Sequence, residues 1–365
     1  MIERQISEPG LILHALSSGG LYGIEHMLLS LLPELAQQGC RSALLCLDGP
    51  DTEVCKAAED LGIPTAFVNC AQRMNPRGWY DLYRTIGACE PRLVHVHGYK
   101  ATILAGAASL AHHVPTVATY HGVAAKAGEH SKALARYLAI ESPILRRFRS
   151  IAAVSEQIDH ELRSRGVRAD RIRVIPNGIN VPAPYATDRA QRDQPRRFDP
   201  CILSLSRLAP EKNVHLVIDA VAALRSEFPH IGLVIAGHGD LLEELQARVQ
   251  AVAMRDSVNF VGFVTDVHPL YTGCDVFVLA SHTEGMPTSL LEAMALEVPI
   301  VASCVGGIPF MLQDEREARL IEPNDFQSLY QALRRLLTDD AMRLRMARAA
   351  RERFERDHTA GRMAA

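Results

Sequence analysis

The sequence predicts an α/β protein built from two doubly wound parallel-sheet domains in tandem. Three observations indicate this fold. The chain has 365 residues, which is long for one ordinary core and suits two. Short runs of Val, Ile, Leu and Ala alternate with longer segments of helical periodicity, as in sheets whose strands are buried on both faces. This alternation stops once, near the middle of the chain, and then restarts.

The first half of the chain contains the apolar runs of one sheet. A strand is expected at 10–16, and a helix follows from about Ile24 to Ala36. Further strands are expected, with helical segments between them, at 41–47, 65–69, 92–97, 115–121, 150–155 and 172–178. We therefore assign residues 1–180 to an N-terminal domain.

A linker and a second sheet follow. Residues 181–200 contain several prolines and many charges but no apolar periodicity. Strands are then expected at 201–206, 231–237, 258–263, 275–281, 299–303 and 318–322, before a helical, Arg-rich end. Residues 201–365 are assigned to a C-terminal domain. Ligands of such sheets bind beyond the carboxyl ends of the strands, so the two domains are expected to face each other across a cleft.

Composition narrows the function classes. The net charge of −3 argues against binding nucleic acid through bulk electrostatics. No apolar run reaches the roughly 18 residues of a membrane span, and the first residues lack a secretory signal pattern. The eight cysteines form no C-x-x-C pair, so we interpret them as small buried hydrophobes in a reducing cytoplasm rather than as disulfide partners or metal ligands.

The first expected strand ends in a glycine-rich turn, "SSGGLYG" (17–23). It nearly matches G-x-G-x-x-G, with Ser18 in place of the first glycine, and Asp48 imitates the acid that binds the ribose of NAD. Three interpretations stay open, namely a tight structural turn, a turn that approaches a ligand closely, and an NAD site. Glu25 can be explained without a ligand, because an acid in the first turn interacts favourably with the helix dipole.

Histidines and cations follow other strands. His97 and His121 each end an expected strand and precede a glycine, which favours a place in the cleft over a purely structural role. Metal ligation is not expected, because no carboxylate or Cys shares their turns at a ligand-like spacing. In the second half, Arg207 and Lys212 converge on a helix start, where a cation opposes the dipole. They are either solvated surface charges or a site for a diphosphate.

The stretch "HTEGMPTSLLEAMA" (282–295) contains two glutamates, Glu284 and Glu292. Ser289 and Glu292 fit an S-x-x-E capping box, which would explain Glu292 without any ligand. Glu284 lies before the turn and is not explained by a cap. A carboxylate pair at this place could instead bind sugar hydroxyls.

Taken together, these motifs resemble those of the retaining glycosyltransferases of family 4, which have the GT-B fold of two Rossmann-like domains. The second half carries the sharper signals, "SRLAPEKN", "IAGHGDLLEEL", "VNFVGFVTDVHPLYTGCDVFVLASHTEGMPTSLLEAMALEVPIVAS" and "VGGIP". The first half matches through "GGLYGIEHMLLSLL", "VHVHG", "TYHG", "AAVSE" and "VIPNGI". The resemblance extends over nearly the whole chain, and the pair of glutamates is its most specific part.

The resemblance implies a metal-independent hexosyltransferase-like enzyme with a nucleotide sugar, UDP- or GDP-linked, as donor and no cofactor. It assigns catalysis to His121, Arg207, Lys212 and Glu284. Donor binding falls to these cations and to Gly20, Gly23, Gly285, Met286, Thr288 and Glu292, with Glu284 on the sugar and Glu292 on the ribose. His97 would lie on the acceptor side. The acceptor hydroxyl is expected to attack the face that the diphosphate leaves, so that the anomeric configuration is retained.

Three departures from the family pattern affect these assignments of residue roles. Asn213 replaces a glycine that often follows the lysine, and Phe310 stands where a glutamate is common, which puts a donor contact there in doubt. The family usually ends with a helix that crosses back onto the first domain. This chain is expected to stop where that helix would begin.

The acceptor is expected to be a saccharide or a lipid-linked sugar of a cell-surface polysaccharide or glycolipid, which places the protein in the cytoplasm. An arginine-rich region offers either a solvated face or peripheral contact with the inner face of the membrane, and comprises Arg146, Arg147, Arg149, Arg163, Arg165, Arg168, Arg171 and Arg173. The alternative functions are a sugar-nucleotide isomerase of the UDP-N-acetylglucosamine 2-epimerase kind and a catalytically silent sugar-nucleotide binder.

Overall fold

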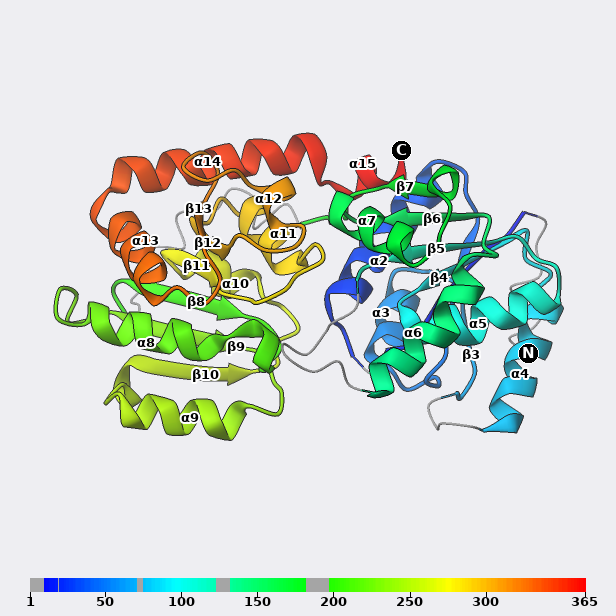
Figure 1. Ribbon diagram of the computed structural model, residues 1–365, viewed down its shortest axis with the longest axis horizontal. Helices are drawn as coiled ribbons and strands as arrows, with labels where there is room; N and C mark the ends of the chain where they lie inside the picture. Colours follow the sequence, from blue (N-terminus) through cyan, green and yellow to red (C-terminus); the bar gives the residue numbers. More distant parts are fainter. Residues whose placement is uncertain (1–9, 19, 71–74, 123–131, 182–196) are drawn as a thin grey trace. The chain divides into compact units, whose positions relative to one another are not determined.

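The computed structural model describes residues 10–18, 20–70, 75–122, 132–181 and 197–365. They form two compact units, each built on one parallel sheet (Figure 1). The chain passes from the first unit to the second between Ile179 and Asn180, next to the predicted domain end at residue 180. Most of the predicted linker lies outside the described residues, at 182–196.

The sheet of the first unit has seven described strands in the order β3-β2-β1-β4-β5-β6-β7. Their bounds are β1 Ile12–Leu16, β2 Ser42–Cys46, β3 Thr65–Phe67, β4 Leu93–His97, β5 Thr116–Tyr120, β6 Ser150–Ala153 and β7 Ile172–Val174. Each lies within one of the predicted apolar runs. All neighbouring pairs are parallel, and the register places His14 beside His95 and Leu16 beside His97.

Helices connect these strands and cover the sheet. They are α2 Gly23–Gln37, α3 Glu53–Asp60, α4 Pro76–Cys89, α5 Tyr99–Ala111, α6 Lys132–Leu145, α7 Glu156–Ser164 and the 3-10 turn η1 Ala169–Arg171. The helices form two groups, one in which α5 contacts both α4 and α6, and one in which α2 contacts α3. This is the arrangement expected when both faces of a parallel sheet are covered.

The second unit repeats the plan with six described strands in the order β10-β9-β8-β11-β12-β13. The strands are β8 Cys201–Leu205, β9 Gly232–Ala236, β10 Val258–Gly262, β11 Val276–Leu279, β12 Ile300–Ser303 and β13 Arg319–Ile321. The helices are η4 Pro210–Lys212, α8 Val214–Leu224, α9 Leu242–Ala251, η5 Arg255–Ser257, α10 His268–Thr272, α11 Thr288–Ala295, α12 Ile308–Met311, α13 Phe326–Thr338 and α14 Asp340–Asp357. Apolar side chains of β8, β9, β11 and α8 form its fully buried core.

Both sheets share one consequence of their strand order. In each, the chain moves outward from a central strand to one edge and then returns to the other side of that strand. The reversal falls between β1 and β4 in the first unit and between β8 and β11 in the second. Ligands of doubly wound folds bind beyond the carboxyl ends of the strands at this switch point. The residues that follow these four strands are therefore the first to examine.

The end of the chain differs from the prediction. Residues Ala360–Ala365 belong to the first unit, not to the predicted C-terminal domain. The short helix α15 (Ala360–Ala364) packs against α2. The Ala360 N–H donates to the Ile179 carbonyl at 3.1 Å, and the Gly178 N–H lies 3.3 Å from the Met363 sulfur. The expectation that no terminal helix reaches the first domain is therefore wrong.

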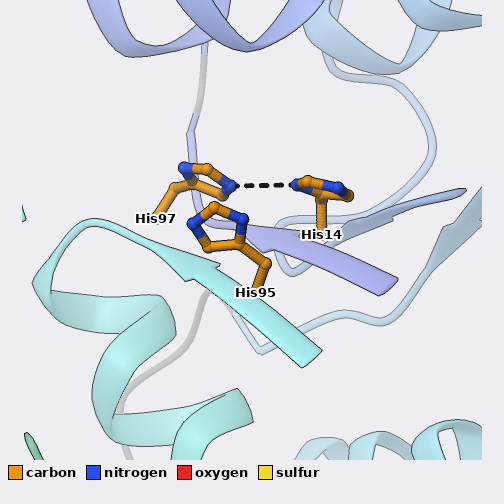
Figure 2. A group of neighbouring side chains, drawn as sticks. All are labelled: His14, His95 and His97. Atoms are coloured by element: carbon orange, nitrogen blue, oxygen red, sulfur yellow. Dashed lines mark hydrogen bonds between the residues drawn. The ribbon is translucent and has the colours of Figure 1, made fainter. Parts of the chain in front are cut away.

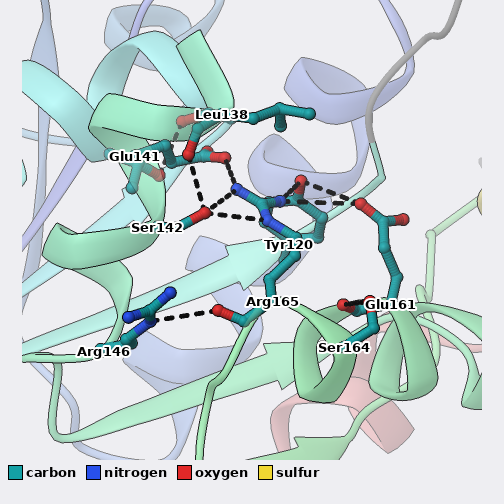
Figure 3. A network of polar contacts seen from close by, with 10 residues as sticks. Tyr120, Leu138, Glu141, Ser142, Arg146, Glu161, Ser164 and Arg165 are labelled. Carbon is teal, nitrogen blue, oxygen red and sulfur yellow. Dashed lines mark hydrogen bonds and ion pairs between the residues drawn. The ribbon is translucent and has the colours of Figure 1, made fainter. Parts of the chain in front are cut away.

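The predicted basic face is largely occupied by contacts within the chain. Arg165, 11% exposed, pairs with Glu141 at 2.5 Å and donates to the Tyr120 hydroxyl (Figure 3). Glu141 is 1% exposed, so this pair is buried. Other arginines of the region also bond within the chain, Arg163 to Asp159, Arg168 to Asp170 and Arg171 to the Arg146 carbonyl. Less positive charge is free for a membrane surface than the sequence indicates.

Two further expectations concern cysteines and membranes. All eight cysteines are free thiols, and most are buried as predicted, although Cys40 is half-buried and Cys304 exposed. Among the described helices, none combines the length and the apolar composition needed to cross a bilayer.

Candidate functional site

The turn after β8 holds two of the predicted cations. Arg207 follows the strand, and the 3-10 turn η4 ends at Lys212. Asn213 then adopts a left-handed conformation, with φ of 50°. Asparagine tolerates this region of backbone space, which explains why it can replace the glycine common in the family. The sharp turn leaves Lys212 two residues before the first residue of α8, with Asn213 as the N-cap between them.

Each cation has a carboxylate partner within the chain. Arg207 donates to the carboxylate of Glu211, which is buried although the arginine is half exposed. The Lys212 Nζ lies 2.6 Å from Glu284 Oε1, and the exposed fractions of these two side chains are 17% and 7%. From the sequence, an anion from outside the chain was expected to balance the charge of Lys212. In the structure Glu284 supplies that balance, so Lys212 and Glu284 form one unit.

Side-chain and backbone contacts together fix the position of Glu284 after β11. The Ser281 hydroxyl donates to Glu284 Oε1 at 2.6 Å, and the His282 N–H donates to the Glu211 carbonyl at 2.8 Å. Gly306 of the "VGGIP" motif has φ of +60°, and a Cβ there would lie 1.7 Å from the Glu284 carbonyl oxygen. The motif is therefore explained by a close backbone approach that only glycine permits.

The first glycine of "AGHGD" has a similar role. Gly237 has φ of +125°, and a Cβ there would lie 1.9 Å from the Ser206 carbonyl oxygen, just before Arg207. The glycine turns after β9 and β12 thus press against the two turns that carry the charged residues. From the sequence alone, this close backbone contact could not be distinguished from an ordinary glycine turn.

The capping-box interpretation of Ser289 and Glu292 is wrong. Helix α11 begins at Thr288 with Pro287 as its N-cap, and no described side chain caps it. Glu292 therefore lies beyond the first turn. Its Oε2 accepts a hydrogen bond from Tyr271, whose hydroxyl oxygen is 2.9 Å away and also lies 2.8 Å from the Ser289 carbonyl. Because a hydroxyl has one proton, Tyr271 donates to one of these oxygens at a time.

Burial controls the chemistry of Glu292. Removal from water raises its pKa from 4.5 to about 7, although the hydrogen bond from Tyr271 acts in the opposite direction. The pKa of Tyr271 is also raised, chiefly by burial and then by the neighbouring carboxylate. A carboxyl group poised near neutrality without an ion-pair partner is unusual for a structural position. Such perturbed groups concentrate at functional sites.

The other predicted donor residues surround this helix start. Gly285 and Thr288 are partly accessible and Met286 is buried, so the segment between the two glutamates presents backbone rather than long side chains. Phe310 lies on α12 with 43% of its surface exposed. Its side chain has no carboxylate that could contact a sugar donor, as expected from the phenylalanine that stands where a glutamate is common in the family.

In the first unit, the turn after β1 places Gly20 and Gly23 at the start of α2. The Glu25 carboxylate accepts a hydrogen bond from the Tyr22 N–H at 2.9 Å, and its pKa is raised, chiefly by burial. Glu25 is thus a local cap for the turn. Asp48, the residue that imitates an NAD-binding acid, is already bonded to Ser17 at 2.6 Å and to Lys100 at 2.7 Å. This arrangement does not favour the NAD interpretation.

The two predicted histidines end adjacent strands. His97 is the last residue of β4, and His121 follows β5, with their ring centroids 6.4 Å apart. Burial lowers the pKa of His121 to about 3, so its imidazole is neutral at pH 7. His97 is 1% exposed and its Nε2 lies 3.2 Å from His14 Nδ1. Its predicted acceptor-side role stays a prediction that this buried position does not favour.

Sequence reasoning missed three residues that hold the second-unit site together, Glu211, Ser281 and Tyr271. All three lie within the quoted motifs, with Glu211 next to Lys212 and Ser281 three residues before Glu284. A buried partner for each cation could have been sought there. Tyr271 lies on α10, far from Glu292 along the chain, and nothing in its local pattern indicates the contact.

Comparison with known proteins places this arrangement in a family. Residues 188–353 match the family "Glycosyl transferases group 1", and residues 22–182 match "Glycosyltransferase Family 4". Among curated relatives, a glycogen synthase of Mycobacterium tuberculosis is 33% identical over 277 residues, 73% of this chain and 65% of the relative. An Escherichia coli UDP-Gal:alpha-D-GlcNAc-diphosphoundecaprenol alpha-1,3-galactosyltransferase is 26% identical over 77% of this chain and 76% of its own.

Solved structures show the same fold. HepE of Anabaena, in complex with UDP-glucose, has a TM-score of 0.83 and 21% identity, with 97% of both chains covered. A glycosyltransferase of Rickettsia africae has a TM-score of 0.76 and 18% identity over 97% of this chain and 95% of its own. The two family matches together extend over nearly the whole chain. The chain belongs to the family 4 glycosyltransferases and has their GT-B fold of two Rossmann-like domains.

Proposed function

We propose that the protein is a retaining glycosyltransferase that moves a sugar from a nucleoside diphosphate to an acceptor hydroxyl. The observation that carries this proposal is the pairing of Lys212 with Glu284 at the switch point of the second sheet, 2.6 Å apart and anchored by Ser281. At this position the cation can bind the diphosphate of a nucleotide sugar, and the acid can bind a hydroxyl of its sugar. Family membership supports the same reading.

The diphosphate is assigned to Arg207 and Lys212. Arg207 is half exposed, and its guanidinium has donors beyond those that Glu211 occupies, so it can bond to phosphate oxygens without leaving Glu211 unpaired. The Lys212 ammonium likewise has three donors and uses one on Glu284. The N-terminal N–H groups of α11, which no described side chain caps, add donors for anionic oxygens.

The two glutamates are assigned to different parts of the donor. Both bonds to Glu284 fall on Oε1, so Oε2 can accept from a sugar hydroxyl while the carboxylate stays fixed. Glu292 is assigned to the ribose hydroxyls, which an ionised carboxylate accepts more strongly than a protonated one. Because its pKa is about 7, this assignment makes nucleotide affinity depend on pH near neutrality.

The reaction needs positive charge where the diphosphate leaves. As the bond from the anomeric carbon to the phosphate oxygen breaks, negative charge grows on the diphosphate, and Arg207 and Lys212 stabilise it. The acceptor oxygen bonds to the anomeric carbon on the face that the leaving group vacates, and its proton passes to a departing phosphate oxygen. His121 is neutral at pH 7, so its role is to hydrogen-bond the sugar and not to supply charge.

The substrate classes follow from relatives and remain part of the proposal. The solved HepE complex contains UDP-glucose, and the Escherichia coli relative is named for UDP-Gal and a lipid diphosphate acceptor. We infer a UDP- or GDP-sugar as donor and a saccharide or lipid-linked acceptor, in cell-surface polysaccharide or glycolipid synthesis. Such an acceptor would bring the protein to the inner face of the membrane.

A panel of nucleotide sugars tests the proposal. Release of nucleoside diphosphate and transfer to short saccharide acceptors are measured, and the anomeric configuration of the first product is read by NMR. We expect Glu292→Ala to weaken binding of the nucleoside diphosphate itself, and Glu284→Gln to impair discrimination between donor sugars. Glu243→Gln, at an exposed position on α9, serves as the matched control. Stabilisation of the protein by no nucleotide or nucleotide sugar would refute the proposal.

A further inference from the structure

Three histidines meet at the switch point of the first sheet, of which His14 and His97 are buried and His95 is half-buried. His14 lies on β1, and His95 and His97 lie on β4, which is its direct neighbour in the sheet. One ring nitrogen of each histidine lies within 4.8 Å of the corresponding atoms of the other two. Figure 2 shows the three rings gathered on one face of the two strands.

The orientation of the rings is set by hydrogen bonds. His14 Nδ1 and His97 Nε2 are 3.2 Å apart, and His95 Nε2 lies 2.8 Å from the Thr119 hydroxyl. Because His95 uses Nε2 for Thr119, its Nδ1 is the atom available to the other two histidines. In Figure 2 this nitrogen is turned toward the gap between His14 and His97.

Two ring nitrogens of the cluster are unmatched polar atoms. His14 Nε2 and His97 Nδ1 are buried and have no hydrogen-bond partner among the described residues. Only one proton can lie between His14 and His97, so each possible tautomer leaves a buried donor and a buried acceptor unmatched. Each such atom costs about 1–3 kcal/mol in a folded protein. The two unmatched atoms are not the nitrogens that converge, so a bound water, and not an ion among the three rings, would satisfy them.

The neighbour of His95 suits a metal ligand. A neutral imidazole presents a lone pair, which is the form that binds metals. Thr119 at His95 Nε2 is the type of outer partner that orients a ligating imidazole.

We propose that His14, His95 and His97 bind one transition-metal ion of the zinc class. The nitrogens involved are Nδ1 of His14, Nδ1 of His95 and Nε2 of His97. Two nitrogens bound to tetrahedral zinc stand about 3.3 Å apart, close to the 3.2 Å between His14 and His97. Imidazole ligands select zinc, copper or nickel over magnesium and calcium.

The site needs a fourth ligand of negative charge. Three neutral imidazoles leave the whole charge of a divalent ion in a buried place, which is costly unless it is compensated. A bound hydroxide would meet this need, since zinc lowers the pKa of its water to about 7. The ion would fasten β1 to β4 below the turns that carry Gly20 and Gly98. None of its ligands is assigned to the donor, so zinc binding and nucleotide binding are tested separately.

Sequence spacing could not indicate this site. His95 and His97 alternate along one strand, and the third ligand lies on another strand, 83 residues from His97. The earlier expectation of no metal site considered only groups within the turns. The parallel register of β1 with β4 brings the three rings together.

Metal titration tests the proposal on the full chain, without a polyhistidine tag and after treatment with a chelator. Isothermal titration with zinc chloride is expected to give about one ion per chain, whereas magnesium chloride gives no saturable binding. Cobalt substituted for zinc should show the visible absorption of a tetrahedral site. His95→Gln should weaken zinc binding more than about 100-fold, while His160→Ala, at an exposed position on α7, leaves it unchanged.

Two results would overturn the proposal. One is the absence of saturable zinc binding to the folded protein. The other is zinc binding that His95→Gln leaves unchanged, which would place the ion elsewhere. If His95→Gln does not fold, X-ray absorption on the zinc-loaded parent protein decides the matter. Three imidazole nitrogens around the metal support the site, and fewer than three refute it.

Discussion

Replacing Glu292 by glutamine should make the protein more stable than the parent at alkaline pH, by an amount that can be worked from the structure. The folded pKa of Glu292 is about 7 against an ordinary value of 4.5. A group whose folded pKa is raised contributes stability that is fully present below the unfolded pKa and is lost as pH rises through the folded pKa.

The magnitude follows from this difference. Between pH 4.5 and 7 the folded state holds one proton that the unfolded state has released. The unfolding free energy therefore falls by about 1.4 kcal/mol per pH unit through this group alone. Over the whole interval the loss is about 3 kcal/mol. Glutamine resembles the protonated acid and does not titrate, so Glu292→Gln should match the parent below the unfolded pKa of 4.5 and exceed it by about 3 kcal/mol at pH 8.

The assay must report on the second unit. The single tryptophan, Trp79, lies on α4 of the first unit, so its fluorescence does not follow α11. Hydrogen exchange of peptides from α10 and α11, measured against denaturant at several pH values, gives the local unfolding free energy. The control Glu243→Gln should differ from the parent by the same amount at every pH. A Glu292→Gln difference that is equally independent of pH would refute the reasoning.

Three further predictions concern other contacts. Tyr271→Phe removes the donor that favours the ionised form of Glu292, so the ionisation midpoint of Glu292 should rise and nucleoside diphosphate affinity at pH 7 should fall about tenfold. Gly306→Ala adds a Cβ 1.7 Å from the Glu284 carbonyl, and should destabilise the second unit by more than about 3 kcal/mol in denaturant unfolding. Arg165→Ala leaves Glu141 buried without its cation and should cost the first unit about 3–5 kcal/mol, read from Trp79 fluorescence.

The chain offers a matched control for two of these changes. Gly262 has φ of +70° but open space around it, so Gly262→Ala should cost only about 1 kcal/mol. Arg168 is 70% exposed and pairs with Asp170 at the surface, so Arg168→Ala should cost about 0.5 kcal/mol or less. Equal costs within either pair would contradict the structural reasons given. A Glu292 midpoint that Tyr271→Phe leaves unmoved would remove the proposed role of Tyr271.

The fold was predictable because its signal is local. A strand buried on both faces needs a short apolar run, and each described strand lies within one of the predicted runs. The helix at the chain's end, α15, was missed because its place depends on packing against α2, which no local pattern records. The positions of Arg207, Lys212 and Glu284 after β8 and β11 could also be inferred, since the carboxyl ends of strands adjacent to a switch point carry ligand sites.

Pairings across the chain were beyond sequence reasoning. Ser289 and Glu292 satisfied the pattern of a capping box. The N-cap of the helix is instead Pro287, two residues before Ser289, and Glu292 is hydrogen-bonded to Tyr271. Lys212 was expected to face an outside anion, but its partner within the chain, Glu284, 72 residues away, was not foreseen. In both cases the local motif was present and a tertiary contact determined the partner. The histidine cluster on β1 and β4 has the same origin.

The central claim is that the second unit binds a nucleoside diphosphate, with Lys212 on the diphosphate and Glu292 on the ribose. Calorimetric titration of the parent, Lys212→Met and Glu292→Ala with UDP, UMP, GDP and GMP tests it most directly. Lys212→Met should weaken binding of the preferred diphosphate by about 30-fold and of its monophosphate far less, because a charged hydrogen bond is lost. Glu292→Ala should weaken both alike. Unchanged affinities in both variants would contradict the account.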